Sequence, residues 1–435
     1  MLIFIQNVPR TYAWGSREAL PEVLATEPTG EPQAELWLGD HEVDPAQVAG
    51  SMAEPLTLID LIERNPEVYG VDGGHLPFLL KVLGIGAPLS LQVHPRKSQA
   101  REGFARENAA GIALDDPARS YKDANHKPEL LVALSRIEAL SGWRELGDAA
   151  NDAAAIARGS GTCGARGSQL LLSFAARVQS AARLSVDGMA GREALLDWLL
   201  PGDEIVTETV RALAEVIMGD APLDLDGVRR DVLRRLVTTH PGDPGVLISL
   251  LMHVVTLDAG EALYLDAGVL HAYLGGVGVE IMASSDNVLR AGLTEKHIDV
   301  PEFRRILDLA TTNDPLFYGA TPAPGLTTWQ PPIPDFQLHR VRVDAEHDPL
   351  DAPGMHLARA VSLEAPYPLV MIATEGVLRV ERIGADLREV ASVRKGHSLY
   401  ISAGGAVELS GSGEAFVASV GSRPEGDISR VEGVS

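Results

Sequence analysis

Hydrophobic and polar positions follow different periods in different parts of this chain. Between residues 144 and 240, apolar residues recur three or four positions apart in two stripes, Val206, Val210, Leu213, Ile217 and Leu225, Val228, Val232, Leu236. This spacing places side chains on one face of a helix. The pattern therefore predicts amphipathic helices that pack against a neighbour, and the alanine-rich residues 148–158 predict a further helix.

Short apolar runs bounded by turn residues flank this helical zone on both sides. Residues 77–83 and 89–95 form such runs before it, and residues 246–290 return to strand character after it, with turns at 258–260 and 266–268. Runs of this kind are typical of buried or half-buried strands. We expect the two stretches to form one sheet structure, with the helical zone inserted between them.

A second β-rich zone occupies the end of the chain. It contains the strand-like pieces 339–343, 367–372, 377–382 and 398–402, punctuated by glycines. Short strands at this spacing are typical of a sandwich or jelly roll. The chain is thus predicted to be mainly β with an inserted helical domain. Its predicted parts are residues 1–143 with 246–320, residues 144–245, and residues 321–435.

Composition narrows the class of protein. The chain has 435 residues, 45% of them hydrophobic and 22% charged, which excludes general disorder. Its net charge of −23, without a Lys/Arg tract, argues against nucleic acid or a membrane surface as a partner. The longest apolar run, residues 246–255, is too short to span a bilayer. We therefore expect a soluble, cytoplasmic protein, in which an anionic small substrate would need a local cluster of cations.

We assign no catalytic or cofactor-binding role to the single cysteine or to the glycine-rich segment near it. The single cysteine, Cys163, excludes an intramolecular disulfide and a Cys-rich zinc site. Residues 159–164 match the dinucleotide-binding spacing G-x-G-x-x-G. That motif needs a preceding strand, whereas a helical pattern precedes it here. We expect a flexible surface loop instead.

Three segments each carry two polar residues two positions apart, namely Gln92 and His94, Lys127 and Glu129, and His271 and Tyr273. In an extended chain such pairs point to the same side. Two imidazoles, a carboxylate and an amide oxygen would suit zinc or another borderline divalent ion, with the ligands Gln92, His94, Glu129 and His271. Taken singly, a strand histidine is more often an ordinary partial-core residue than a ligand, Gln92 would be a routine polar neighbour and Glu129 a solvated acid at a strand end. The pattern alone therefore leaves both interpretations open.

Isolated charges within apolar runs are the second signal. Lys81 and Glu280 each interrupt a hydrophobic run, and such residues are rarely buried unless paired. Either they face a cleft or they lie on edge strands. Arg290 and Lys296 follow the His271 strand. Near a metal they could hold a phosphate, although solvated loop charges are the alternative.

These same segments resemble type I phosphomannose isomerases, zinc enzymes of the cupin superfamily. The resemblance rests on the blocks YAWGS (12–16), ELWLG (35–39), PFLLKVL (77–83), PLSLQVHP (88–95), NHKPEL (125–130), HAYL (271–274) and SDNVLRAGLT (285–294), which occur in family order. They cover residues up to 145 and 258–305. The resemblance implies a cupin jelly-roll β-barrel as catalytic domain and a C-terminal cupin-like β domain.

The resemblance also implies a reaction and a site. The reaction is the zinc-dependent interconversion of mannose 6-phosphate and fructose 6-phosphate through a cis-enediol, in carbohydrate metabolism leading to GDP-mannose. One zinc ion per chain would be bound by Gln92, His94, Glu129 and His271. The residues implied in catalysis are Arg290, Lys127, His126 and Lys81. The residues implied in lining the substrate cleft are Tyr273, Lys296, Glu280 and Asp286. We expect a monomer whose partner is the sugar phosphate.

Two alternatives come from other functional classes. A metal-dependent cupin oxygenase would want two histidines and one carboxylate around iron, with open positions. The amide ligand Gln92 and the cations near the site argue against it. A non-catalytic sugar-phosphate-binding cupin would be expected to have a broken ligand set, whereas the set is intact here.

Overall fold

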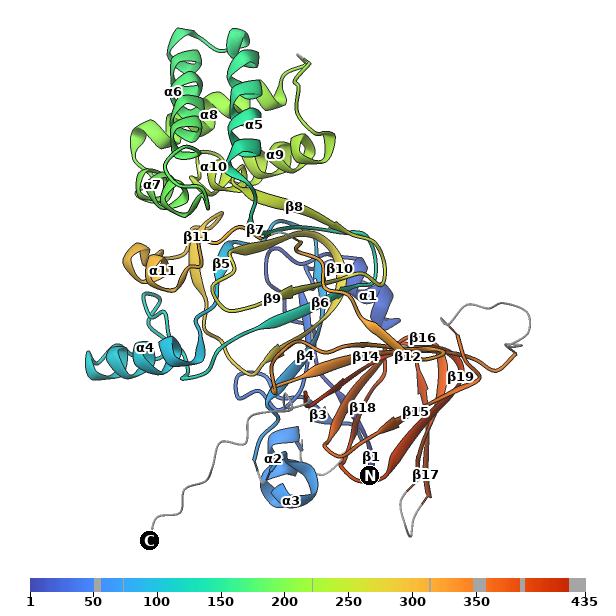
Figure 1. Cartoon of the computed structure of the whole chain (residues 1–435). Helices are drawn as coiled ribbons and strands as arrows, with labels where there is room; N and C mark the ends of the chain where they lie inside the picture. Colours follow the sequence, from blue (N-terminus) through green and yellow to red (C-terminus); the bar gives the residue numbers. More distant parts are fainter. Residues whose placement is uncertain are drawn as a thin grey trace.

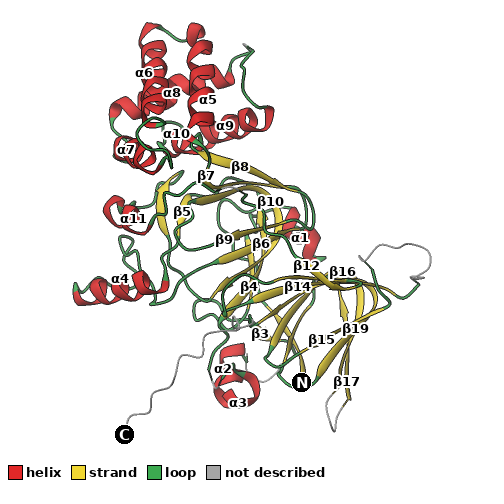
Figure 2. Cartoon of the chain, viewed as in Figure 1, coloured by secondary structure: helices red, strands yellow, loops and turns green. Residues whose placement is uncertain are grey.

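The protein consists of a helical domain and two β-rich parts, which lie one below the other in Figure 1. The computed structural model describes residues 1–50, 56–72, 74–220, 222–312, 314–346, 357–383 and 388–421. Figure 2 shows that the strands are confined to the middle and lower parts, while the upper part is helical. The prediction of a mainly β protein with a helical insertion is confirmed.

The middle part is a sheet that has nine strands in the described ranges. These strands are β2 (Glu35–Leu38), β4 (Phe78–Ile85), β5 (Leu91–Val93), β6 (Glu129–Ala133), β7 (Ile137–Trp143), β8 (Met252–Leu257), β9 (Ala262–Leu265), β10 (His271–Ala283) and β11 (Leu289–Gly292). They come from both sides of the helical insertion, so the expectation that the two stretches form one sheet structure is confirmed.

Strand β10 is shared by the two layers of this sheet. Its first half lies between β5 and β7, where His271 is paired with Gln92 and with Ser141. Its second half lies between β4 and β6, where Glu280 is paired with Lys81 and with Leu131. The sheet therefore closes around an interior in jelly-roll fashion. Apolar residues such as Leu131 fill this interior.

The helical part consists of α5 (Leu146–Arg158), the 3₁₀ turn η1 (Gly159–Thr162), α6 (Ala165–Ala181), α7 (Met189–Leu199), α8 (Glu204–Met218), α9 (Gly227–Thr239) and α10 (Gly245–Ser249). The stripe predicted for α8 is confirmed, and its apolar residues are buried. In α9, Val232 and Leu236 are buried as predicted, whereas Val228 is only half-buried and Leu225 precedes the helix. Asp203 and Asp226 cap the two helices by accepting hydrogen bonds from the backbone N–H groups of Val206 and Arg229.

Two local expectations for this region were wrong. Residues 159–162 form a 3₁₀ turn between two helices rather than a surface loop, and Ser160 and Cys163 beside it are buried. Helix α5, rather than a strand, comes directly before the turn, which agrees with rejecting a dinucleotide site. Residues 245–249 form helix α10, and strand structure begins only at Met252. A continuous apolar run cannot by itself distinguish a buried helix from a strand.

The lower part is a sheet with ten strands among the described residues. It contains β1 (Leu2–Gln6), β3 (Gln47–Val48), β12 (Ala320–Ala323), β13 (Leu326–Trp329), β14 (Gln337–Asp344), β15 (Ala360–Glu364), β16 (Leu369–Ile383), β17 (Arg388–Arg394), β18 (Ser398–Ile401) and β19 (Ala406–Ser419). The predicted pieces 367–372 and 377–382 belong to one strand, β16, in which Gly376 has a φ of 65°. The prediction of a C-terminal β part is confirmed.

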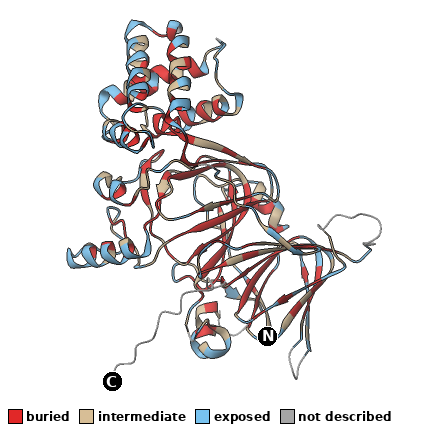
Figure 3. Cartoon of the chain, in the orientation of Figure 1, coloured by how far each residue is buried: buried red, intermediate tan, exposed pale blue. Residues whose placement is uncertain are grey.

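The first strand of the chain belongs to this C-terminal sheet, which the sequence did not predict. Strand β1 pairs antiparallel with β18, with Leu2 opposite Ile401. An apolar cluster that includes Leu130, Phe336 and Phe416 joins the two β parts. Figure 3 shows that the strands facing this contact are buried. The exact domain boundaries stay predictions.

Five further helices lie outside these parts, within the ranges that the structure describes. They are α1 (Ala19–Leu24), α2 (Leu58–Arg64), α3 (Pro66–Tyr69), α4 (Lys97–Ala109) and α11 (Val300–Ile306). Helix α11 follows β11, the strand that carries Arg290. In the described part of the chain, none of the helices combines the length and apolar character needed to cross a bilayer.

Candidate metal centre and active site

Three buried side chains from separate strands converge in the barrel. His94 follows β5, Glu129 begins β6 and His271 begins β10, and one ligand atom from each lies within 4.8 Å of the others. The Nε2 atom of His94 is 3.2 Å from Oε1 of Glu129, and Nε2 of His271 is 3.6 Å from Oε2. All three residues are almost inaccessible to solvent.

The hydrogen bonds of the two histidines fix where their protons lie. Nδ1 of His94 is 2.7 Å from the carbonyl oxygen of Asn287, and Nδ1 of His271 is 2.9 Å from that of Val269. A carbonyl only accepts, so each Nδ1 donates and each Nε2 is left with a lone pair. Burial, aided by the Lys127 charge, lowers the pKa of His94 to about 4, which keeps this ring neutral at pH 7.

The resulting cluster lacks internal hydrogen bonds at the atoms that face its centre. Nε2 of His94, Nε2 of His271 and Oε2 of Glu129 are all buried without a hydrogen-bond partner. In the neutral tautomer that the Nδ1 hydrogen bonds select, each ring presents the lone pair of Nε2 to the carboxylate. A divalent cation would satisfy all three acceptors, and the hydrogen bonds at Nδ1 orient the rings for it.

Gln92 lies on the same face as these ligands. It precedes His94 by two residues in an extended segment, and it is paired in register with both His271 and Arg290. Directly paired residues of antiparallel strands point to the same side of a sheet. The strands therefore set Gln92, His271 and Arg290 in one row, beside His94.

Lys127 contacts the ligand carboxylate directly. Its Nζ atom is 2.6 Å from Oε1 of Glu129. Burial alone would raise the pKa of Glu129, but the neighbouring Lys127 ammonium outweighs it and holds this pKa well below its usual range. Burial would likewise lower the pKa of Lys127, yet Glu129 and Glu280 raise it. The pair is thus ionised, with one carboxylate oxygen on the lysine and the other facing the two histidines.

Lys81 and Glu280 are buried beside this pair. Lys81 lies on β4 between β2 and β10, and its Nζ is 3.6 Å from Glu35 and 3.9 Å from Glu280. Neither residue is on an edge strand, so that alternative was wrong. The hydroxyl of Tyr273 donates to Glu280 at 3.2 Å. Burial and the Glu129 charge raise the pKa of Glu280 to about 8.

Arg290 is a half-buried cation whose guanidinium forms no ion pair or hydrogen bond with the described residues. Burial lowers its pKa. Burial and the neighbouring Arg290 charge also lower the pKa of the exposed Lys296. Two unneutralised cations next to each other, in a protein of charge −23, suit an anionic ligand.

The two remaining predicted residues contact other parts of the chain. The carboxylate of Asp286 is 3.6 Å from Nε2 of His41. Nε2 of His126 is 3.1 Å from Asp335, which lies in the loop before β14 of the C-terminal sheet. His126 therefore meets the second β domain, while its neighbour Lys127 reaches Glu129.

Sequence analysis missed several residues that this site uses. The ring of Trp37 lies 4.4 Å from Nζ of Lys81, and Glu35 also contacts that lysine. Asp123 accepts the backbone N–H of Asp286 at 2.8 Å and thereby anchors its loop. Glu35 and Trp37 belong to the ELWLG block, which was a usable signal. Asp123 stands in a polar turn, where nothing in the sequence marks it.

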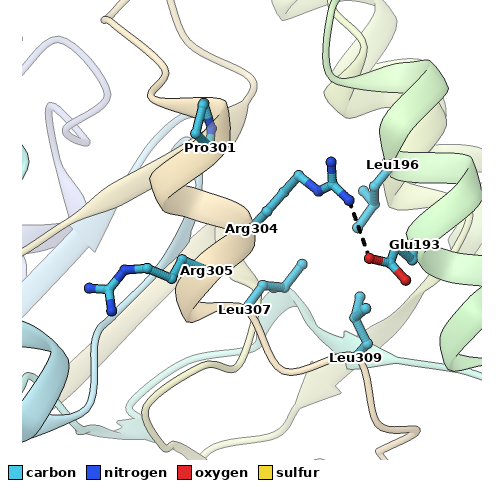
Figure 4. Close-up of a pocket in the computed structure, with 7 residues that line it drawn as sticks. All are labelled: Glu193, Leu196, Pro301, Arg304, Arg305, Leu307 and Leu309. Carbon is cyan, nitrogen blue, oxygen red and sulfur yellow. Dashed lines mark hydrogen bonds and ion pairs between the residues drawn. The ribbon is translucent and has the colours of Figure 1, made fainter.

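A separate cavity of about 300 Å³ lies between α7 and α11. Figure 4 shows Arg304 extended from α11 towards Glu193 of α7, with Leu307 and Leu309 beneath them. Arg304 is paired with Glu193 and with Asp197, so its charge is neutralised. This cavity contains none of the residues of the metal centre, and we assign the chemistry to the barrel.

The jelly-roll barrel and its buried cluster of two histidines, a carboxylate and a nearby amide define a metal-dependent cupin-type enzyme. Residues 2–146 match the family model for the catalytic domain of type I phosphomannose isomerase. The chain belongs to the type I phosphomannose isomerase family.

Relatives and solved structures agree with this assignment. The mannose-6-phosphate isomerase of Salmonella typhimurium is 40% identical over 302 residues, which covers 68% of this chain and 72% of the relative. The human mannose-6-phosphate isomerase is 32% identical over 356 residues, covering 76% and 80%. A zinc-bound crystal structure of mannose 6-phosphate isomerase superposes with a TM-score of 0.80 at 29% identity, covering 97% of this chain and all of that one.

Proposed function

We propose that this chain is a zinc-dependent aldose–ketose isomerase that interconverts mannose 6-phosphate and fructose 6-phosphate. The observation that carries the proposal is the set of three buried atoms, on His94, Glu129 and His271, that face one another without hydrogen-bond partners among the described residues. Family membership and the zinc-bound relative supply the metal and the substrate. Gln92 would complete the ligand set, which then holds one zinc ion with a net positive charge.

The reaction moves one proton from C2 of the aldose to C1 and another from O2 to O1, and negative charge develops on oxygen in the enediolate between these transfers. Bound zinc would supply Lewis-acid stabilisation of that charge. Gln92, His94, Glu129 and His271 would hold the ion, and the hydrogen bonds of the two histidines and the ion pair of Glu129 with Lys127 keep their donor atoms oriented. The barrel interior around them is apolar and buried, which excludes bulk water from the developing charge.

The remaining residues of the cleft bind and orient the substrate and stabilise the charge that develops on it. Arg290, with Lys296 beside it, supplies positive charge for the anionic substrate and for the enediolate. Lys127 is kept protonated chiefly by the Glu129 carboxylate and acts as a charge and a hydrogen-bond donor next to it. Lys81, held between Glu35 and Glu280, presents a second buried ammonium. Tyr273, Glu280 and Asp286 offer groups for the sugar hydroxyls, and His126 serves in opening the sugar ring.

The location and the oligomeric state of the protein are part of the proposal. We propose a cytoplasmic monomer whose partner is the sugar phosphate, without nucleic acid or membrane. The strongly acidic charge and the single cysteine support this view. Light scattering of the purified protein measures its mass directly, and the mass of a dimer would contradict the proposed monomer.

A coupled assay tests the activity. Formation of fructose 6-phosphate from mannose 6-phosphate is followed before and after treatment with a chelator, and then after zinc is returned. Turnover that is lost and restored with zinc supports the proposal. An intact, zinc-loaded protein without turnover would contradict it. Oxygen consumption, measured in parallel, tests the oxygenase alternative, which the comparisons do not favour.

A further inference from the structure

His41 lies in the wall of the proposed substrate cleft, just after β2. Its side chain is only 9% exposed. The imidazole packs edge-on against Trp37, with 5.0 Å between ring centroids. Lys81 contacts the same indole from 4.4 Å. His41 and Lys81 are therefore two polar groups arranged around one buried aromatic ring.

The hydrogen bonding of His41 fixes its tautomer. Nδ1 accepts the backbone N–H of Val43 at 3.3 Å, so the ring proton is on Nε2. That Nε2 atom faces Oδ2 of Asp286 at 3.6 Å. This separation is an ion-pair contact and is too long for a hydrogen bond, but polar contacts in active sites commonly shorten into hydrogen bonds when substrate binds. His41 thus offers its proton to one oxygen of the Asp286 carboxylate.

Asp286 is held at a fixed place relative to the metal ligands. Its backbone N–H donates to Asp123 at 2.8 Å. The next residue, Asn287, accepts the Nδ1 proton of the ligand His94. The side chain of Asp286 is 33% exposed, and its Oδ1 atom has no hydrogen bond to the described residues. One carboxylate oxygen therefore faces His41, and the other is available to a ligand.

We propose that His41 is a positioning residue, whose Nε2–H orients the Asp286 carboxylate so that Oδ1 accepts a hydrogen bond from a sugar hydroxyl. This inference rests on the proposed function and deepens it, because it names how the cleft recognises the polyol part of its substrate. His41 is almost fully buried behind Asp286, so it acts through that residue and does not touch the sugar.

The chain offers a matched control next to His41. Asp40, the preceding residue, pairs with Nδ1 of His75 at 2.8 Å. This is a second histidine–aspartate pair on the same loop, but the His75 side chain is 54% exposed and lies outside the cleft. A His75→Gln variant removes the imidazole from a comparable histidine–aspartate pair without altering the proposed substrate cleft.

Two substitutions at position 41 separate the proton donor from the local fold. In His41→Gln, the amide nitrogen takes the place of Nε2 and can still donate to Asp286. In His41→Asn, the amide oxygen takes the place of Nδ1 and keeps the bond to Val43, but no donor reaches Asp286. We expect His41→Asn to weaken fructose 6-phosphate binding about tenfold, and His41→Gln to retain most of the affinity. Calorimetry on the zinc-loaded full chain measures both.

A double-mutant cycle with Asp286→Asn completes the test. If His41 acts through Asp286, His41→Asn weakens binding in the native background but has little further effect in Asp286→Asn. Zinc content and the His75→Gln control should match the native protein. Equal affinities of His41→Asn and His41→Gln, or losses that simply add in the double variant, would overturn the inference. If the native protein itself neither binds nor converts sugar phosphate, the proposed function fails as well, so the two failures are distinguishable.

Discussion

The hydroxyl of Tyr273 donates a hydrogen bond of 3.2 Å to Glu280, seven residues further along the same strand. Regular alternation would place residues an odd number apart on opposite faces of a sheet. The register shift between Tyr273 and Gly275 reverses the alternation. Before it, the odd-numbered His271 and Tyr273 face the barrel interior, and after it the even-numbered Glu280 does.

A methyl group at Gly276 is expected to disrupt this arrangement. Gly276 has a φ of 114°, and an added Cβ would lie 2.4 Å from the carbonyl oxygen of Arg136. We expect Gly276→Ala to destabilise the protein by about 2 kcal/mol or more and to lower kcat. Denaturant unfolding measures the first effect. Gly147→Ala is the control, because no atom crowds that helical position and alanine should stabilise it slightly.

Removing a metal ligand should abolish bound zinc and turnover together. His271→Ala takes away one of the three unprotonated acceptors, and Glu129→Gln takes away the only charge among them. We expect less than a tenth of the native zinc content in either variant, measured by atomic spectroscopy. His253→Gln is a suitable control, since His253 lies on the adjacent strand β8 but contacts Thr312 instead. Full zinc content in His271→Ala would refute the ligand assignment.

Arg290→Ala is expected to keep zinc and to lose most of kcat. Arg290 is paired in register with Gln92 but is not among the metal ligands, so its removal should affect the substrate and not the zinc. Loss of one such charge typically costs on the order of a hundredfold. The exposed Arg101 on α4 provides a control for removal of an arginine. Normal turnover in Arg290→Ala would show that its catalytic assignment is wrong.

His339 should make the C-terminal sheet sensitive to acid. Burial lowers its pKa to about 4, and its Nδ1 is paired with Thr328 at 2.9 Å. The unfolded chain binds a proton near pH 6.5, whereas the folded chain does not until about pH 4. Stability contributed by neutral His339 is therefore complete above pH 6.5 and falls between pH 6.5 and 4, by on the order of 3 kcal/mol.

A comparison of unfolding curves at pH 7 and pH 4.5 measures this effect. The native protein should lose more stability on acidification than His339→Gln does. His397→Gln, at an exposed position, should behave like the native protein. An identical acid response in all three would contradict the assignment to His339.

The sequence predicted those features that local spacing determines. The stripes of α8 and α9 depend on contacts three and four residues apart, and the pairs around His94, Glu129 and His271 depend on strand alternation. These were visible without knowledge of the partner strands. The resemblance to a family then selected one interpretation for residues, such as Gln92, that spacing alone left open.

The features that could not be predicted from the sequence depend on contacts between segments that are distant in the chain. Helix α10 and a strand share the same apolar run, because both are buried and only their tertiary neighbours distinguish them. His41 and Asp123 stand in polar turns, where aspartate and histidine are common for local reasons. Their importance follows from the loop at Asp286, which lies far away in the chain and is brought to them by the fold.

The antiparallel pairing of Leu2 with Ile401 sets an order on biosynthesis. Strand β1 is translated long before β18, and until β18 emerges only the short strand β3 can pair with it, through Ile5 and Gln6. Nascent chains stalled before residue 401 would therefore leave the β18-facing edge of β1 open to chaperones and proteases, however well the barrel has already formed.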